Sequence, residues 1–124
     1  MINYADETGG FTIRLEQHAG RTLVRVRPYG IWGRTVSQAF RAASLRTCAE
    51  LSGRRWSMLW ENGAFPRQRP YVLAVLEHAR RAAILAGMET AAVLEADPNC
   101  RVTAGLNPRF TSEREAIAYA VGLH

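Results

Sequence analysis

The sequence predicts a single α/β domain: an N-terminal antiparallel hairpin that continues into a mixed, mostly parallel sheet of four to five strands, with three to four helices. Three observations predict this fold. Apolar and polar residues alternate in two short segments near the N-terminus, as in strands with one buried face. The apolar spacing then changes to three or four residues, which is typical of helices. Strand-like and helical segments alternate from there on, and right-handed crossover helices make the later strands parallel.

The hairpin comes first. Residues 11–16 alternate between apolar and polar side chains, which predicts a strand. A connection at residues 18–20 contains glycine, and beyond it Val24 and Val26 alternate with Arg25 and Arg27. This second strand ends at Pro28 to Gly30. The period of two puts the valines on the buried face and the arginines on the solvated face.

A helix and a third strand follow. Thr35 and Gln38 have the spacing of a capping box, and apolar residues continue at helical spacing to Leu51 before Ser52 and Gly53 end the helix. Residues 54–60 are predicted to form a strand, with its large apolar side chains on one face. These side chains are Trp56, Met58 and Trp60.

The remaining elements are read in the same way. Residues 61–69 have no clear period and predict a long loop, while Pro70 suits the first turn of a helix that extends to Gly87. Residues 90–96 predict a buried strand, and residues 100–106 a single helical turn. Residues 109–110 are predicted to form a short last strand. Ser112 and Glu115 form a second capping box, which begins a final helix to residue 123.

Composition and length exclude several classes of protein. At 124 residues and average hydrophobicity, the chain predicts one globular domain, residues 1–124. No apolar run is long enough for a transmembrane helix and no signal peptide is visible, so a cytoplasmic protein is expected. Cys48, Cys100 and the three histidines lack metal-ligand spacing. We therefore expect no metal, no cofactor and no catalytic set, and leave open whether Arg101 makes Cys100 reactive.

The order of elements and several short motifs resemble the STAS-like group of small bacterial proteins, which includes anti-sigma-factor antagonists and a domain appended to sulfate transporters. The motifs are Trp-Gly-Arg-Thr at 32–35, Arg-Trp-Ser-Met-Leu-Trp-Glu-Asn at 55–62, Ala-Ala-Val-Leu at 91–94 and Phe-Thr-Ser-Glu-Arg-Glu-Ala-Ile-Ala-Tyr at 110–119. The resemblance covers nearly the whole chain. It implies a non-enzymatic regulatory domain that acts through a protein partner or through a second copy of itself.

The resemblance also implies a site in the loop after the third predicted strand. Regulatory members carry a phosphorylated Ser or Thr there, where a helix N-terminus meets the phosphate. This chain has Glu61, Asn62 and Gly63 instead, and no Ser or Thr before Thr90. We therefore expect partner binding without the phosphorylation switch. The candidate partner-binding residues are Glu61, Asn62, Gly63, Arg67 and Arg69.

A small-molecule or lipid-binding domain is the alternative function. Four aromatic residues lie near the predicted strand ends and could line an apolar cleft there, although they could equally close the core. These ligand-pocket candidates are Trp32, Trp60, Phe65 and Tyr71. The formal net charge is +5, and all 16 basic residues are arginine. No nucleic-acid-binding motif accompanies this charge, so nucleic acid is an unlikely partner.

Overall fold

One mixed sheet organises the chain, of which the computed structural model describes residues 1–95 and 108–122. Its strands lie in the order β1-β2-β3-β4-β5-β6; the first two pairings are antiparallel and the other three are parallel. The strands are β1 (Ile2–Asp6), β2 (Gly9–His18), β3 (Arg21–Gly30), β4 (Trp56–Glu61), β5 (Met88–Leu94) and β6 (Arg109–Phe110). The helices are α1 (Arg34–Leu51), α2 (Pro70–Leu85) and α3 (Glu113–Ala120). The predicted α/β class and its mostly parallel sheet are confirmed.

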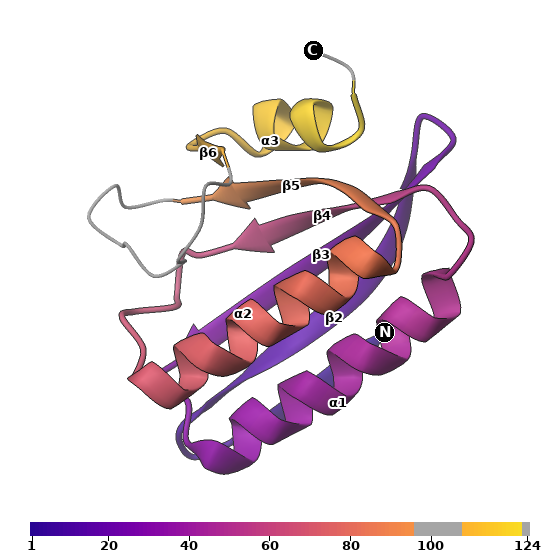
Figure 1. The fold of residues 1–124 in the computed structure, drawn as a ribbon. Helices are drawn as coiled ribbons and strands as arrows, with labels where there is room; N and C mark the ends of the chain where they lie inside the picture. The colour runs from indigo at the N-terminus through magenta and orange to yellow at the C-terminus, as the bar shows by residue number, and fades with distance from the viewer. Residues whose placement is uncertain (96–107, 123–124) are drawn as a thin grey trace.

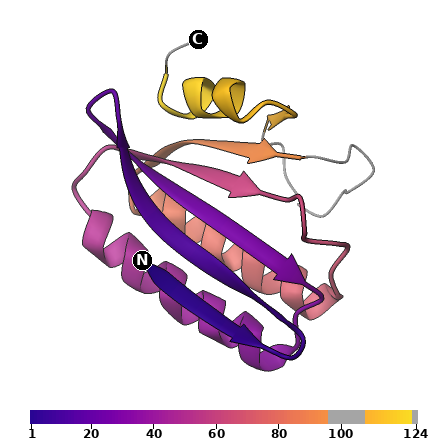
Figure 2. The same cartoon turned by 180° about the vertical axis from the view of Figure 1, so that it is seen from behind.

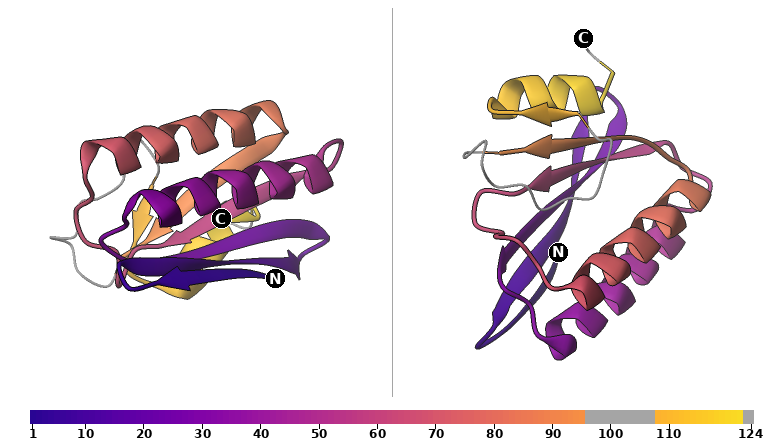
Figure 3. Two further views of the ribbon diagram at one scale, coloured as in Figure 1. Left: turned by 90° about the horizontal axis from the view of Figure 1, so that it is seen from below. Right: turned by 60° about the vertical axis from the view of Figure 1, so that its left-hand side comes forward.

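The helices form two unequal layers. Helices α1 and α2 lie side by side on one face of the sheet (Figure 1), and α3 lies on the opposite face (Figure 3). From behind, α3 lies over the side of the sheet that holds β4 to β6, reaches Leu23 and Arg25 of β3, and leaves β1 and β2 without a helix (Figure 2). The larger apolar core therefore lies under α1 and α2, and a smaller cluster around Leu23, Leu59 and Ala92 lies under α3.

Strand β1 was not predicted, and it raises the strand count to six from the expected four or five. It pairs with β2 through a tight turn in which the Asp6 carboxylate accepts hydrogen bonds from the backbone N–H and the hydroxyl of Thr8, at 2.7 and 2.6 Å. The next turn, at Ala19 and Gly20, has positive φ at both residues, the geometry that suits a two-residue hairpin. The predicted hairpin is thus confirmed and extended by one strand.

The two predicted capping boxes differ in outcome. Helix α1 begins at Arg34 after Gly33, which has no side-chain cap, so the Thr35 box is wrong. The Gly33 N–H instead donates to the Thr8 hydroxyl at 3.0 Å, a contact from the distant β1–β2 turn. At α3, the Ser112 hydroxyl accepts from the Glu115 N–H at 3.3 Å, as predicted.

Strand β3 lies in the middle of the sheet and is covered on both faces. Val24 and Val26 face the larger core, as expected. Arg25 was predicted to be solvated, but only 4% of its side chain is exposed, because α3 and the neighbouring strands enclose it. The large apolar residues of β4 share one face, as predicted. The predicted turn at residues 100–106 lies outside the described residues.

Candidate partner-binding surface

The loop that joins β4 to α2, residues 62–69, lies at the edge of the sheet where the parallel strands β3 and β4 end. The N-terminal turns of α1 and α2 lie at the same edge (Figure 1). The loop is attached to the end of β3, where the Gly30 N–H donates to the carbonyl oxygen of Ala64 at 3.1 Å. Residues distant in sequence thus form one surface at this edge.

Gln68 holds this loop in place from within. Its side chain is 5% exposed. Its Oε1 accepts from the Trp32 N–H at 2.9 Å, and its Nε2 donates to the carbonyl oxygens of Gly30 at 2.8 Å and Pro66 at 2.7 Å. A segment without sequence periodicity therefore has a defined position, because one buried amide satisfies three backbone groups. The sequence offered no signal that singled Gln68 out.

Asn62 begins the loop and is buried, although it was a candidate for partner contact. Its Oδ1 accepts from the Trp60 indole N–H at 2.6 Å, and its Nδ2 lies 3.3 Å from Oε1 of Glu95. Arg109 donates to the same Glu95 oxygen at 2.5 Å. Asn62 therefore joins the ends of β4, β5 and β6 and presents no surface to a partner in this structure.

The aromatic ligand-pocket candidates pack against one another. The Phe65 ring lies 5.0 Å from that of Trp32 and 5.7 Å from that of Trp60, between ring centroids. Trp32 and Phe65 are fully buried, and Trp60 nearly so. Tyr71 is half-buried and donates its hydroxyl to the Trp32 carbonyl oxygen at 3.2 Å. These rings close the core under the loop, which is the alternative role that the sequence left open for them.

Three exposed arginines gather at this edge. The Arg34 guanidinium lies over the Tyr71 ring, 4.5 Å from its centroid, and Nη1 of Arg69 is 3.4 Å from the Tyr71 hydroxyl oxygen. Arg67 lies in the same loop and is exposed, as is Gly63. Within residues 1–95 and 108–122, none of these arginines has an ion-pair partner, and neither α1 nor α2 carries an acid in its first turn. Arg34 was not among the partner-binding residues predicted from the sequence, although it lies in the Trp-Gly-Arg-Thr motif.

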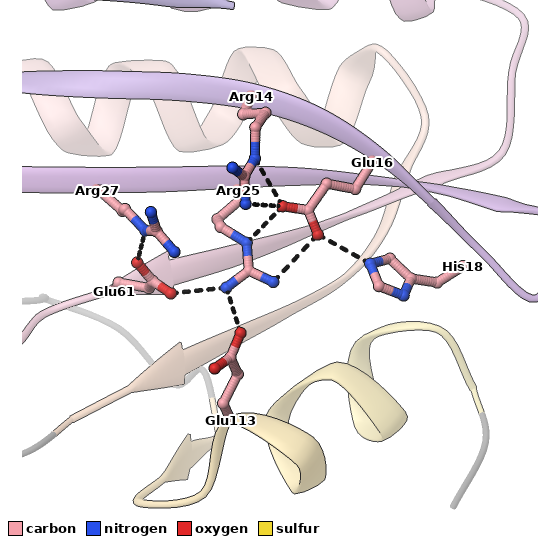
Figure 4. A network of polar contacts seen from close by, with 7 residues as sticks. All are labelled: Arg14, Glu16, His18, Arg25, Arg27, Glu61 and Glu113. Carbon is pink, nitrogen blue, oxygen red and sulfur yellow. Dashed lines mark hydrogen bonds and ion pairs between the residues drawn. The ribbon is translucent and has the colours of Figure 1, made fainter.

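Glu61 points away from this surface, into an ion-pair network on the α3 side of the sheet (Figure 4). Nη1 of Arg25 donates to Glu61 at 2.7 Å and to Glu113 at 2.8 Å, while its Nε donates to Glu16 at 2.7 Å. Arg27 pairs with the second oxygen of Glu61. Glu61 was a partner-binding candidate; here it joins β4 to β3.

The network shifts the ionisation of its buried members. Hydrogen bonding from Arg25 is the main cause that lowers the pKa of Glu16 to about 2, against a smaller opposing effect of burial; His18 and Arg14 also contribute. Burial by itself would lower the pKa of Arg25, but the hydrogen bonds that Arg25 donates to Glu16, Glu61 and Glu113 outweigh it and raise that pKa. Both groups are therefore charged at neutral pH, so the network is a set of ion pairs that links the strands to α3 and is not an acid–base pair.

An apolar cavity of about 90 Å³ lies elsewhere, between the sheet and helices α1 and α2. Trp60 is the one aromatic ligand-pocket candidate that reaches it. Ser44, Glu77 and Arg80, all partly exposed, contribute polar groups to the lining. The rest of the lining is mainly apolar and includes Val24, Val26, Phe40, Cys48, Trp56, Met58, Leu73, Leu76, Ala83 and Val93.

Metal-ligating and nucleophilic groups are scattered over the part of the chain that the structure describes. No three His, Cys, Asp or Glu side chains converge there in a way that could hold a metal ion. His18 pairs with Glu16, and His78 is exposed on α2. Cys48 is buried, and burial raises the pKa of its thiol. Cys100 and its neighbour Arg101 lie outside the described residues. No helix among those described is long and apolar enough to cross a membrane.

Comparisons with known proteins identify the fold. No protein-family model matches the chain, and no curated protein matches it in sequence. An uncharacterised protein of the DUF3478 family from Shewanella loihica PV-4, described as having a SpoIIAA-like fold, superposes with a TM-score of 0.71 at 12% identity, over 94% of this chain and 98% of its own. The anti-sigma factor antagonist SpoIIAA in its unphosphorylated form superposes with a TM-score of 0.64 at 19% identity, over 91% and 99%. The chain has the SpoIIAA-like fold, which is the fold that the sequence resemblance implied.

Proposed function

We propose that this domain is a non-enzymatic bacterial regulatory module that binds a protein partner through the arginine surface, defined as Arg34, Arg67 and Arg69 together with the loop of residues 62–69. The observation that carries the proposal is the combination of a loop held rigidly by Gln68 with exposed arginines that no carboxylate of the described chain neutralises. A rigid surface with unpaired charge loses little conformational entropy on binding. The fold of an anti-sigma factor antagonist supports a role in protein contacts.

The loop of this surface has no Ser or Thr for a phosphorylation switch of the kind the family resemblance implies. From Glu61 to Glu89 the chain has no Ser or Thr. The phenol of Tyr71 is hydrogen-bonded to the Trp32 carbonyl oxygen and lies beside Arg34. Partner binding at this loop is consequently controlled by the concentrations of the two proteins or by a change in the partner, and not by phosphorylation of the loop.

The test is affinity enrichment from a lysate of the source bacterium with three immobilised forms of the protein. R67A/R69A removes two charges from the arginine surface. R46A/R54A removes the same charge from exposed positions in the second half of α1 and just before β4, away from the loop. We expect a protein that is retained by the wild type and by R46A/R54A but lost with R67A/R69A, and its purified form should bind with the same pattern. Equal retention by all three forms would remove the loop from the interface.

A second copy of the chain is the other protein partner that the resemblance implies. Sedimentation equilibrium across a concentration series detects self-association directly. If the wild type dimerises and R67A/R69A does not, the arginine surface is the dimer interface. A monomer at all concentrations leaves the heterologous partner as the proposal.

The cavity under α1 and α2 favours a second candidate function, binding of a small apolar ligand. Its volume accommodates about six water-sized groups, and its apolar lining suits a short hydrocarbon segment with a polar end near Glu77 and Arg80. Native mass spectrometry of freshly purified protein should reveal a retained ligand, and L76W, which places a larger side chain in the lining, should abolish it. Wild-type protein that is ligand-free and stays so after incubation with medium-chain fatty acids and alcohols would exclude this function.

A further inference from the structure

The proposed arginine surface has a chemistry that narrows the class of partner. We infer that it recognises an acidic peptide segment, one in which several Asp or Glu residues surround an apolar side chain. This inference rests on the proposed function and specifies what the partner presents. Neither the fold nor its relatives assign a ligand of this kind.

The first argument is the distribution of carboxylates. Arginines elsewhere in the described chain are ion-paired on several elements; the pairs include Arg14 and Arg25 with Glu16, Arg55 with Glu89, Arg81 with Glu77 and Arg109 with Glu95. The arginine surface gathers three guanidinium groups that have no acid within ion-pair distance among residues 1–95 and 108–122. Arg41, Arg46, Arg54 and Arg114 are also unpaired there, but they lie outside the loop and the first turns of α1 and α2. At this surface the carboxylates that pair with the arginines would therefore come from a partner.

The second argument is the position of the guanidinium groups. Arg34 and Arg69 approach the same Tyr71 side chain, one over the ring face and one at the hydroxyl. Stacking leaves the N–H edge of a guanidinium free for bidentate contact with a carboxylate. Tyr71 is itself anchored to Trp32, so two charges are held at neighbouring positions before any partner binds. Spaced carboxylates on one peptide match that arrangement.

The third argument concerns the helix ends beside these arginines. Helices α1 and α2 both begin at this edge without a side-chain cap and without an acid in the first turn. The positive ends of the two helix dipoles therefore add to the field of the arginines. By contrast, α3 has Glu113 and Glu115 in its first turn and a Ser112 cap.

The fourth argument favours a peptide over a nucleic acid. Ile31, which is 48% exposed, lies between Gly30 and Trp32, two of the three residues that Gln68 binds, so an apolar contact adjoins the arginines. Single-stranded nucleic acid needs free aromatic faces for base stacking. Phe65 and Trp32 are buried, and Arg34 covers a face of the Tyr71 ring, so the surface has arginines and an aliphatic anchor but few free ring faces.

Fluorescence anisotropy with three labelled probes, two 10-residue peptides and one oligonucleotide, tests the inference. The probes are a peptide of alternating Glu-Asp pairs around a central Leu, its Gln-Asn counterpart, and a single-stranded oligonucleotide of equal charge. We expect the wild type to bind the acidic peptide, with affinity falling as salt rises, and to bind the neutral peptide at least about tenfold more weakly. R67A/R69A and R34A should each weaken binding about tenfold, and R34K should recover only part of the loss because lysine cannot make the planar stack or the bidentate contact. The matched charge control R46A/R54A should change binding less than twofold.

Two results of the anisotropy experiment overturn the inference. One is equal loss with R46A/R54A and with R67A/R69A, which indicates diffuse attraction. The other is tighter binding of the oligonucleotide than of the acidic peptide. These outcomes are distinct from failure of the proposed function: a lysate protein that needs Arg67 and Arg69 but has no acidic segment refutes this inference alone. If the peptide binds as expected and no partner depends on the arginines, the proposed function fails instead.

Discussion

Nη1 of Arg25, in β3, donates to Oε1 of Glu113, the first residue of α3, at 2.8 Å and across 88 residues of sequence. The same nitrogen lies 2.7 Å from Glu61 of β4, and the Arg25 Nε lies 2.7 Å from Glu16 of β2. One arginine thus connects three strands and the only helix on its side of the sheet, within the described residues (Figure 4). Because its side chain is 4% exposed, the charge depends on these carboxylates for its solvation.

Replacing Arg25 by Met should destabilise the domain strongly. The substitution keeps an apolar stem but leaves Glu16 and Glu61, each 17% exposed, without their shared cation. Breaking a buried ion pair by removing one partner costs several kcal/mol, and we expect a loss of about 3 kcal/mol in the free energy of unfolding by urea. R14A is the control: Arg14 also contacts Glu16 but is 46% exposed, so its loss should cost about 0.5 kcal/mol or less. Equal stability of R25M and R14A would show that the network does not stabilise the fold.

The pKa of Glu16 predicts a dependence of stability on pH. Its folded-state pKa of about 2 lies below the ordinary glutamate value of 4.5, so the unfolded chain binds a proton more readily than the folded chain between these values. The contribution of Glu16 is therefore complete above pH 4.5 and is lost as the pH falls towards 2. Urea unfolding at a series of pH values should show the stability advantage of the wild type over E16Q shrinking across this window. Parallel curves for the two proteins would contradict the assignment; E89Q, at an exposed pair, should show a weaker pH effect.

Replacing Glu113 by Ala should loosen α3 without unfolding the sheet. The Glu113 side chain is 56% exposed, so its bond to Arg25 contributes little to global stability. It adds an anchor to a short helix that also packs on a small apolar cluster and accepts a hydrogen bond from the Thr90 hydroxyl at the Ala120 carbonyl oxygen. Hydrogen exchange should become faster in residues 113–122 and remain unchanged in β3 and β4. E115A removes an acid from the same helical turn without a contact to Arg25, so it separates loss of that bond from loss of a favourable helix-dipole charge. Identical exchange in E113A and E115A would count against the Arg25 contact.

Replacing Gln68 by Ala should disorder the arginine surface while leaving all of its charges in place. The substitution removes three hydrogen bonds and leaves the Trp32 N–H and the Gly30 carbonyl without their partner, at a cost of about 2 kcal/mol. Chemical denaturation measures that cost, and anisotropy with the acidic peptide measures the loss of binding. Q38A, at an exposed position of α1, is the control and should alter neither. Unchanged peptide affinity in Q68A would show that charge alone, without preorganisation, governs the surface.

The predicted elements succeeded where the signal was local. Alternation over residues 11–16, helical spacing after Val36 and the position of Pro70 each depend on neighbours in sequence, and the corresponding strands and helices are present. The Ser112 cap is equally local and is confirmed. Strand β1 was missed because it is a short edge strand that becomes visible only through its pairing with β2.

The sequence predicted which loop holds the candidate site, from the position of that loop after a strand. Which residues the site exposes depends on contacts between residues that are distant in sequence. The loop after β4 does present exposed Arg67 and Arg69. Asn62 and Glu61 instead turn inward to Glu95 and Arg25, residues whose proximity no spacing reveals. Arg34 joins the surface because the start of α1 lies beside Tyr71 of α2.

The sequence by itself determined the α/β class, the order of most elements and the resemblance to STAS-like domains, because these follow from the periodicity of apolar residues and from local turn chemistry. Only the tertiary structure decided that Arg25 is buried, that Gln68 holds the loop and that three arginines at this loop have no carboxylate partner among residues 1–95 and 108–122. The physical reason is the same in each case. Burial and charge pairing depend on which residues meet across the sheet, and an arginine on a strand has the same local pattern whether water or a carboxylate faces it.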